Sequence, residues 1–186
     1  EYKKYFEGRL LKIPGKIAIR TNEGIPAVDE AITELKNTKP LETLQSSKGL
    51  SFASKSHVND QGPKGLVGHD GSDGSSPSDR MNRMGKWDTL SAENISYGYS
   101  IARDVLIQLI VDDGVPSRGH RSNLLKKGLK YAGAGCGDHK KYKSMCVMNF
   151  AGKYTEKNQN PDNTETEKNG SKSVKEKVLP GKKDDW

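Results

Sequence analysis

The segment from 62 to 77, GPKGLVGHDGSDGSSP, constrains the fold most, because it places five glycines and two prolines within sixteen residues. Neither a helix nor a central strand tolerates that composition, since glycine costs backbone entropy and proline lacks an N–H donor. The chain must therefore cross this region as a long loop, either structured or mobile. The loop carries one histidine, His69, and regular elements are expected on both sides of it.

Helical patterns flank this loop. In residues 26–37 a proline stands in the first turn and apolar residues share one face, and a second helical stretch covers about 50–60. After the loop, Ser76 is the expected N-cap of a short helix that Gly85 ends. The longest helix is expected from about Ser100 through IARDVLIQLIVDD. Its wide apolar arc predicts that it is covered on most sides.

Strand patterns occur near the start and near the end of the folded region. Residues 16–21, KIAIRT, alternate in polarity and predict a short strand. Two strand-like runs, YAGAGCG and SMCVMNFAG, flank a short polar connection and predict a hairpin. Cys136 and Cys146 lie at equal distances from its turn. They are compatible with a disulfide made in an oxidising compartment or with two reduced core cysteines.

The last thirty-four residues, 153–186, contain only five apolar residues among many Lys, Asn, Glu, Thr and Asp. Such a segment cannot bury enough apolar surface to offset the entropy of ordering, so we expect a disordered tail. Residues 1–25 are expected to be an N-terminal extension with a short strand. The length remaining is that of one domain, which we place at 26–152.

The formal net charge is +7 and the pI is near 9.3. This charge favours weak attraction to anionic polymers or membrane surfaces, but a lysine-rich soluble surface explains it as well. No recognition helix or zinc-finger spacing points to specific nucleic-acid binding. No run is long enough to span a bilayer. Because the chain opens with Glu1 rather than Met, we expect a trimmed chain whose membrane attachment, if any, is a lipid anchor upstream.

Three ionisable residues stand in segments that could hold them in place: His69 in LVGHDGSDG, Glu93 in SAENISYG and His120 in RGHRSNLL. Taken singly, each also has a structural explanation, as an exposed loop residue, a helix-entry acid and a partner of nearby aspartates. His57 and His139 are interpreted as a helix-surface residue and a residue of the hairpin turn.

The segment VDDGVPSRGHRSNLL, 111–125, places two acids at a helix end, where carboxylates oppose the helix dipole at a cost of roughly 0.3 to 1 kcal/mol each. Departures of this kind tend to mark sites or compensating ion pairs. Arg118 and Arg121 could neutralise the acids. Alternatively, one of the two aspartates and His120 face a common cavity.

The order of five motifs resembles the CAP superfamily, also called SCP-like or pathogenesis-related domains. The motifs are HVNDQGPKGLVGHDGSDGSSPSDRMNRMG, SAENISYG, DDGVPSRGHRSNLL, GAGCG and VMNFAG. The similarity is to the bacterial branch and, in overall sequence, to spirochaetal outer-surface lipoproteins. The aromatic-rich run that follows the second histidine in the eukaryotic branch is replaced here by Arg121-Ser122-Asn123-Leu124-Leu125, so properties tied to that run are not transferred.

The resemblance implies an α+β fold, a three-layer α/β/α sandwich with a small, mainly antiparallel sheet between helices. It also implies a cavity in which two histidines and two acids converge and can bind zinc. By motif these are His69, Glu93, His120 and Asp112. Two positions differ from the family pattern: Ala92 replaces a glycine, and Asp112 stands where Glu is common. Imidazole and carboxylate are ordinary zinc ligands, and three protein ligands leave room for a water.

The resemblance further implies a surface or secreted, extracytoplasmic protein. We expect it to be non-enzymatic and to bind a lipid, a sterol or a host partner, with no residue matched to a lipid site. The alternative is a metal-dependent hydrolase, a protease or esterase, that uses the histidine and glutamate cavity. No serine or cysteine stands in a nucleophile motif.

Overall fold

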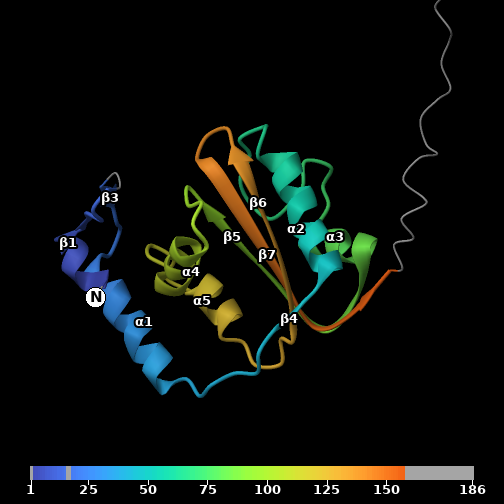
Figure 1. Ribbon diagram of the computed structural model, residues 1–186, viewed down its shortest axis with the longest axis horizontal. Helices are drawn as coiled ribbons and strands as arrows, with labels where there is room; N and C mark the ends of the chain where they lie inside the picture. The colour runs from blue at the N-terminus through green and yellow to red at the C-terminus, as the bar shows by residue number, and fades with distance from the viewer. Residues whose placement is uncertain (1, 16–17, 158–186) are drawn as a thin grey trace, which may run out of the picture.

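A four-stranded sheet forms the middle layer of the protein, whose computed structural model describes residues 2–15 and 18–157 (Figure 1). The strand order is β4-β6-β7-β5, with β4 parallel to β6 and the other pairs antiparallel. A separate small sheet is built from β1, β2 and β3. The elements are η1 (Tyr2–Tyr5), β1 (Phe6–Glu7), β2 (Leu10–Leu11), β3 (Ile19–Arg20), α1 (Ile25–Asn37), β4 (Gln45–Ser46), α2 (Lys48–Gln61), α3 (Pro77–Met84), β5 (Gly85–Tyr97), α4 (Ala102–Val111), α5 (Gly119–Leu124), β6 (Tyr131–His139) and β7 (Lys143–Glu156).

Helices cover both faces of the central sheet, so the predicted three-layer α/β/α sandwich is confirmed. Helices α2 and α3 lie on one side, and α4, α5 and α1 lie on the other (Figure 1). Side chains alternate between the faces along each strand. Ile95 of β5 packs with Val58 of α2, whereas Cys146 of β7 packs with Val105 and Leu109 of α4.

The hairpin of β6 and β7 agrees with the sequence, and its cysteines are bonded. Cys136 lies directly opposite Cys146 in the antiparallel register, and the two form a disulfide. This decides the alternative that the sequence left open. Gly133 of β6 lies so close to the backbone of α2 that a Cβ at this position would collide with it, which explains the glycine here.

Several helices begin and end near the predicted residues. Helix α3 has Ser76 as its N-cap, and Asp79 completes a capping box by accepting from the Ser76 N–H. Helix α4 lies where it was predicted, but the predictions that it is the longest helix and that it is covered on most sides are wrong. It has 10 residues and is shorter than α2, which has 14. Of its apolar residues only Val105 and Leu109 are buried, because one side of α4 faces an open groove instead of a covering element.

His57 does not lie on the helix surface as predicted, and His139, which lies at the hairpin turn as predicted, is buried. His57 is fully buried under the loop that follows α2, and its Nε2 lies 2.9 Å from the carbonyl oxygen of Gly68. His139 is also buried, with Nε2 2.8 Å from the carbonyl oxygen of Leu66. Both imidazoles therefore hold the glycine-rich segment against the domain, and the part of it that they fix is a structured loop.

The ends of the predicted domain differ in detail. Strand β7 continues to Glu156, past the expected boundary at residue 152. The rest of the predicted tail, 158–186, lies outside the described residues, as do residues 16–17 of the predicted first strand. Among the described residues, no helix is long and apolar enough to cross a bilayer.

Candidate functional site

Glu93 is the centre of the first polar cluster. It projects from β5, and its side chain is almost completely buried, as is that of Arg80 from α3. Arg80 Nη2 donates to both carboxylate oxygens, at 3.1 and 2.9 Å. His69 Nδ1 lies 2.9 Å from Glu93 Oε1, while the His69 side chain remains 52% exposed. The hydrogen bond to Glu93 raises the pKa of His69, against the opposing effect of burial.

Asp112 and His120 form a second pair. Asp112 is the C-cap of α4 in the left-handed conformation, and its carboxylate is buried. His120 Nδ1 lies 2.7 Å from Asp112 Oδ1. Asp112 Oδ2 accepts from the backbone N–H groups of His120 and Arg121, at 2.9 and 3.3 Å. The carboxylate therefore lies at the start of α5, where the helix dipole favours it, and this offsets its unfavourable position at the end of α4.

Asp113 has a different structural task. Its two oxygens accept from the backbone N–H groups of Asn22, Glu23 and Gly24, at 2.6 to 3.1 Å. Those residues lead directly into α1. The unusual pair of acids at the end of α4 thus fixes the start of two other helices, one by each carboxylate.

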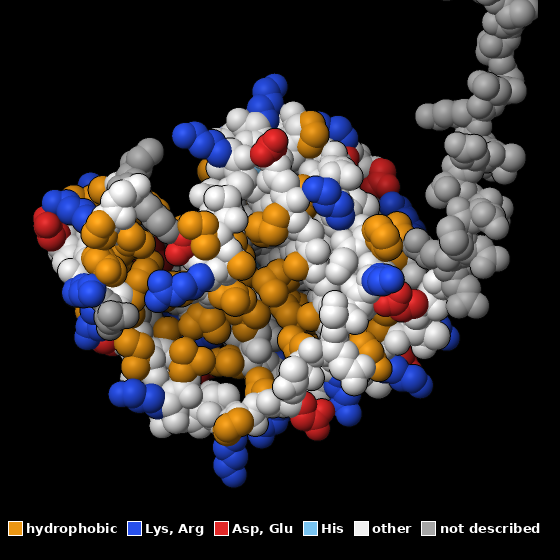
Figure 2. All heavy atoms as spheres, viewed as in Figure 1, with side chains coloured by type: hydrophobic (Ala, Val, Ile, Leu, Met, Phe, Trp, Pro, Cys, Tyr) orange, Lys and Arg blue, Asp and Glu red, His pale blue; other side chains and the backbone are white. Residues whose placement is uncertain are grey.

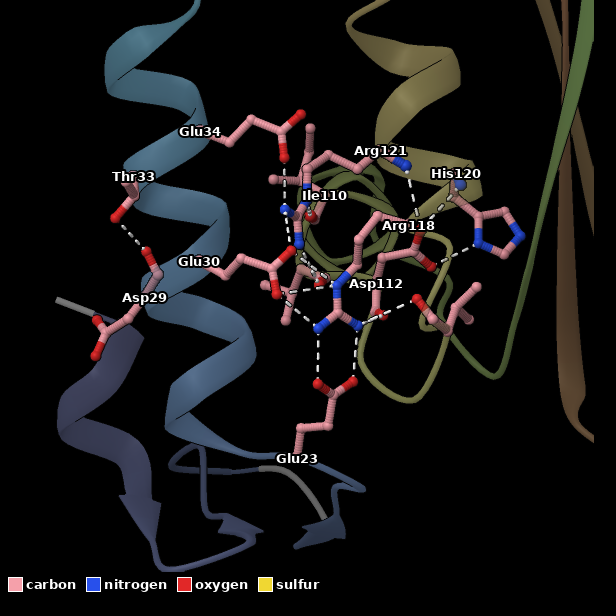
Figure 3. A network of polar contacts seen from close by, with 12 residues as sticks. Glu23, Asp29, Glu30, Thr33, Glu34, Ile110, Asp112, Arg118, His120 and Arg121 are labelled. Carbon is pink, nitrogen blue, oxygen red and sulfur yellow. Dashed lines mark hydrogen bonds and ion pairs between the residues drawn. The ribbon is translucent and has the colours of Figure 1, made fainter.

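Arg118 and Arg121 bind glutamates of the α1 region and do not pair with the aspartate carboxylates, as Figure 3 shows. Arg118 contacts Glu23 and Glu30 at 2.7 and 2.8 Å. Arg121, whose side chain is fully buried, contacts Glu30 and Glu34 and donates to backbone carbonyl groups at the end of α4. Of the two alternatives that the sequence left open, direct neutralisation of Asp112 and Asp113 by these arginines does not occur. The acids accept hydrogen bonds from backbone N–H groups, and Asp112 also pairs with His120.

The four predicted zinc ligands lie in two separate pairs, His69 with Glu93 and His120 with Asp112. Within the described ranges, no three His, Cys, Asp or Glu side chains come together in a way that could hold a metal ion. Both oxygens of Glu93 are already bound by Arg80, a permanent cation. A site with three or four protein ligands does not fit this arrangement, and zinc binding stays a prediction.

The helical layer carries an apolar groove between α1 and α4, which sequence reasoning missed. Its volume is about 360 Å³. Figure 2 shows hydrophobic side chains gathered over this side of the molecule. Tyr2 lies at the groove, and burial raises its pKa to about 12, so it stays neutral. The lining residues are Tyr2, Lys3, Val28, Ala31, Ile32, Leu35, Leu106, Ile107, Ile110 and Val111.

Arg80 is the other functional residue that sequence reasoning missed. A signal was available: it lies four residues before Met84 in α3, and Met81 beside it was expected on the buried side of that helix. A charged residue on a buried face requires a buried partner, and Glu93 provides it. The groove had a weaker signal, since apolar residues on α1 and α4 are compatible with full packing as well as with an open surface.

The fold and its two histidine–acid pairs define a small α+β sandwich domain of a recurrent type. The profile of the Cysteine-rich secretory protein family, CAP, matches residues 22–150, and the chain belongs to this family. A search of curated proteins finds no significant match.

Solved structures with the same domain come from several bacteria. An outer surface protein of Borrelia burgdorferi is 20% identical, with a TM-score of 0.51, over 72% of this chain and 91% of that chain. An extracellular SCP-domain protein of Bacillus anthracis is 22% identical, with a TM-score of 0.49, over 68% of this chain and 39% of that chain. A cysteine-rich secretory protein of Staphylococcus aureus is 18% identical, with a TM-score of 0.41, over 69% of this chain and 38% of that chain. This chain spans less than half of the latter two proteins.

Proposed function

We propose that this CAP domain is an extracytoplasmic, non-enzymatic binding protein that holds a single-chain lipid in the groove between α1 and α4. The observation that carries the proposal is the groove itself, an open cavity whose wall is almost entirely apolar. Pockets for small molecules are typically about 300 to 1,000 Å³ and mostly apolar. At about 360 Å³ this groove suits one acyl chain better than the several rings of a sterol.

The two helices supply complementary walls. Val28, Ala31, Ile32 and Leu35 follow the helical repeat along one face of α1, and the apolar residues of α4 oppose them. Leu106 remains 43% exposed although it lies on this inner side. Covering such surface is worth about 25 cal/mol per Å², which favours an apolar occupant. Lys3 is the charged lining residue, and its Nζ pairs with Asp29 Oδ1 at 2.7 Å, so the proposal rests on the apolar wall alone.

The disulfide supports the proposed location. Cross-strand disulfides persist in oxidising compartments and are rare in reducing ones. The Borrelia burgdorferi relative of the same fold is described as an outer surface protein, which agrees with an extracytoplasmic position. Attachment by a lipid anchor upstream of Glu1, and a host molecule as an additional partner, stay predictions.

Leu106→Glu tests the groove. A carboxylate there would have to lose its hydration when an acyl chain enters, so we expect the affinity for a fluorescent fatty acid to fall at least about tenfold. The measurement is a fluorescence titration of the full chain. Ile101→Glu is the matched control, because Ile101 is an exposed apolar residue outside the groove and the new charge is the same. Equal affinities of both variants and the wild type would overturn the proposal.

The second candidate, a metal-dependent hydrolase, is favoured by one observation. Each candidate imidazole has Nδ1 beside a carboxylate, an arrangement that commonly orients a histidine so that its Nε2 can bind a metal. Calorimetric titration with Zn²⁺, with peptide and ester hydrolysis assays on the same samples, tests it. Zinc uptake and hydrolysis that both disappear in His120→Ala would support the hydrolase. Equal zinc uptake by the variant, or no hydrolysis with zinc bound, would exclude it.

A further inference from the structure

One end of the molecule combines exposed apolar side chains with exposed lysines. The loop after α2 and the turn between β6 and β7 lie at this end (Figure 1). Leu66 is 43% exposed, Val67 55% and Tyr142 39%. The lysines of the turn are exposed as well, and basic side chains project from this end in Figure 2. We call this surface the apolar–basic end; it consists of Leu66, Val67, Lys140, Lys141, Tyr142 and Lys143.

The exposed apolar residues are held in place on both sides. The carbonyl oxygen of Leu66 accepts from His139 Nε2 at 2.8 Å, and the Leu66 N–H donates to the carbonyl oxygen of Gln61. The Gly68 N–H donates to the Tyr97 hydroxyl at 3.0 Å, and the Gly68 carbonyl lies 2.9 Å from His57 Nε2. Leu66 and Val67 are therefore displayed by a fixed backbone. Because this backbone is already ordered, less conformational entropy is lost when a partner binds.

The lysine-bearing turn is joined to the same framework. The Lys140 N–H donates to the carbonyl oxygen of Gly62 at 2.9 Å. The rings of Tyr97, His139 and Tyr142 contact one another, with centroids 5.3 to 5.4 Å apart. The imidazoles of His57 and His139 are buried where they make this connection. The loop and the turn consequently form one rigid surface.

The charge at this end is mainly positive, with three exposed lysines against the exposed Asp138. No salt bridge to Lys140, Lys141 or Lys143 is found within the described part of the chain, and Lys141 lies over the ring of Tyr142. Lys64 is nearby but is bound by Asp60. Asp138 is the exposed acid that precedes the turn. Three lysines around aliphatic and tyrosine side chains match a bilayer surface, where anionic head groups lie above acyl chains.

We propose that the apolar–basic end docks peripherally on an anionic lipid bilayer. Leu66, Val67 and Tyr142 enter the interface between head groups and acyl chains, and the three lysines contact lipid phosphates. Tyrosine suits this depth because its ring is apolar and its hydroxyl is polar. The docking surface does not include the α1–α4 groove, so the membrane-docking proposal does not depend on the proposed lipid ligand.

Flotation of the full chain with vesicles tests the docking surface. We expect binding to phosphatidylglycerol/phosphatidylcholine vesicles, little binding to pure phosphatidylcholine, and weakening by salt. Changing Lys140, Lys141 and Lys143 together to Gln should reduce partitioning roughly fivefold per lysine, on the order of a hundredfold in all. The double variant Leu66→Ser, Val67→Ser should reduce partitioning at least about tenfold, because the favourable transfer of two apolar side chains from water into the bilayer is lost.

Matched controls separate the surface from general charge and hydrophobicity. Changing Lys126, Lys127 and Lys130 to Gln alters net charge equally, and Phe52→Ser removes an apolar residue that is 50% exposed on α2. Both controls should float like the wild type, and circular dichroism should confirm that every variant is folded. Equal losses in the controls and the test variants, or equal binding to neutral vesicles, would overturn the proposal. Unchanged fatty-acid binding by the lysine variant would confirm that the groove is separate.

Discussion

Single carboxylates determine how the polar clusters are arranged. Glu93 accepts from a buried arginine and an exposed imidazole at once, so one anion joins the interior of the domain to its surface. Asp112 similarly joins a buried helix end to the partly exposed His120. Removing either carboxylate leaves polar groups without partners, which costs more than the hydrogen bonds contribute when they are intact.

Glu93→Gln should lower the pKa of His69 toward its ordinary 6.5, because the hydrogen bond to the carboxylate is the main cause of the increase. In the wild type the raised pKa favours the protonated imidazole in the folded state. Its contribution to stability is therefore complete below the unfolded pKa and is lost as pH rises through the folded pKa. Titration of the histidine ring signals by NMR measures the change.

The same variant should be destabilised by about 3 to 5 kcal/mol, because Arg80 keeps its charge in a buried position without a carboxylate. Asp70→Asn is the control, since Asp70 contributes least among the groups that act on His69. An unchanged His69 pKa in Glu93→Gln would show that the hydrogen bond does not control this histidine.

Whole elements were predictable where local signals agreed. Helix α3 has a capping box, a proline in its first turn and a glycine after its last residue, and each signal acts within a few residues. The hairpin likewise follows from two alternating runs about a polar turn, and its register places Cys136 opposite Cys146. These features depend on residues that are close in the sequence, so they can be predicted from the sequence alone.

Elements whose environment depends on distant partners were not predictable. The apolar arc of α4 indicates apolar surroundings, but it cannot distinguish a covering element from an open groove. The burial of His57 and His139 was not predictable, because their partners are carbonyl groups of a loop that no periodicity describes. The four candidate residues were assigned by motif. Their division into two pairs depends on Arg80 and on the start of α5, which are tertiary contacts that a motif does not contain.

At the scale of the whole molecule, Arg118 and Arg121 attach α1 to the rest of the domain (Figure 3). They hold three glutamates of the α1 region, while Asp113 holds the backbone that leads into α1. Helix α1 forms one wall of the groove, so this attachment also sets the width of the groove. The position of the groove wall therefore depends on these ion pairs as well as on packing.

The ion pairs predict a specific response to acid. Hydrogen bonds from Arg118 lower the pKa of Glu23 and of Glu30 from 4.5 to about 2. Because these folded-state pKa values are depressed, the stability they contribute is present above about pH 4.5 and is lost as pH falls toward 2. Solvent weakens the effect, since both glutamates are partly exposed.

Arg118→Gln should reduce the free energy of unfolding by about 1 to 3 kcal/mol at pH 7, because several hydrogen bonds from a charged group are lost. The difference from the wild type should shrink between pH 4.5 and 2, as Glu23 and Glu30 become protonated in the wild type. Urea unfolding followed by circular dichroism at several pH values measures this difference.

Arg83→Gln is the control, because Arg83 pairs with Asp73 at an exposed position and Ser75 is the main cause of the lowered Asp73 pKa. A difference between Arg118→Gln and the wild type that stays constant down to pH 2 would show that the glutamates do not depend on Arg118. The attachment of α1 would then rest on Asp113 and on packing.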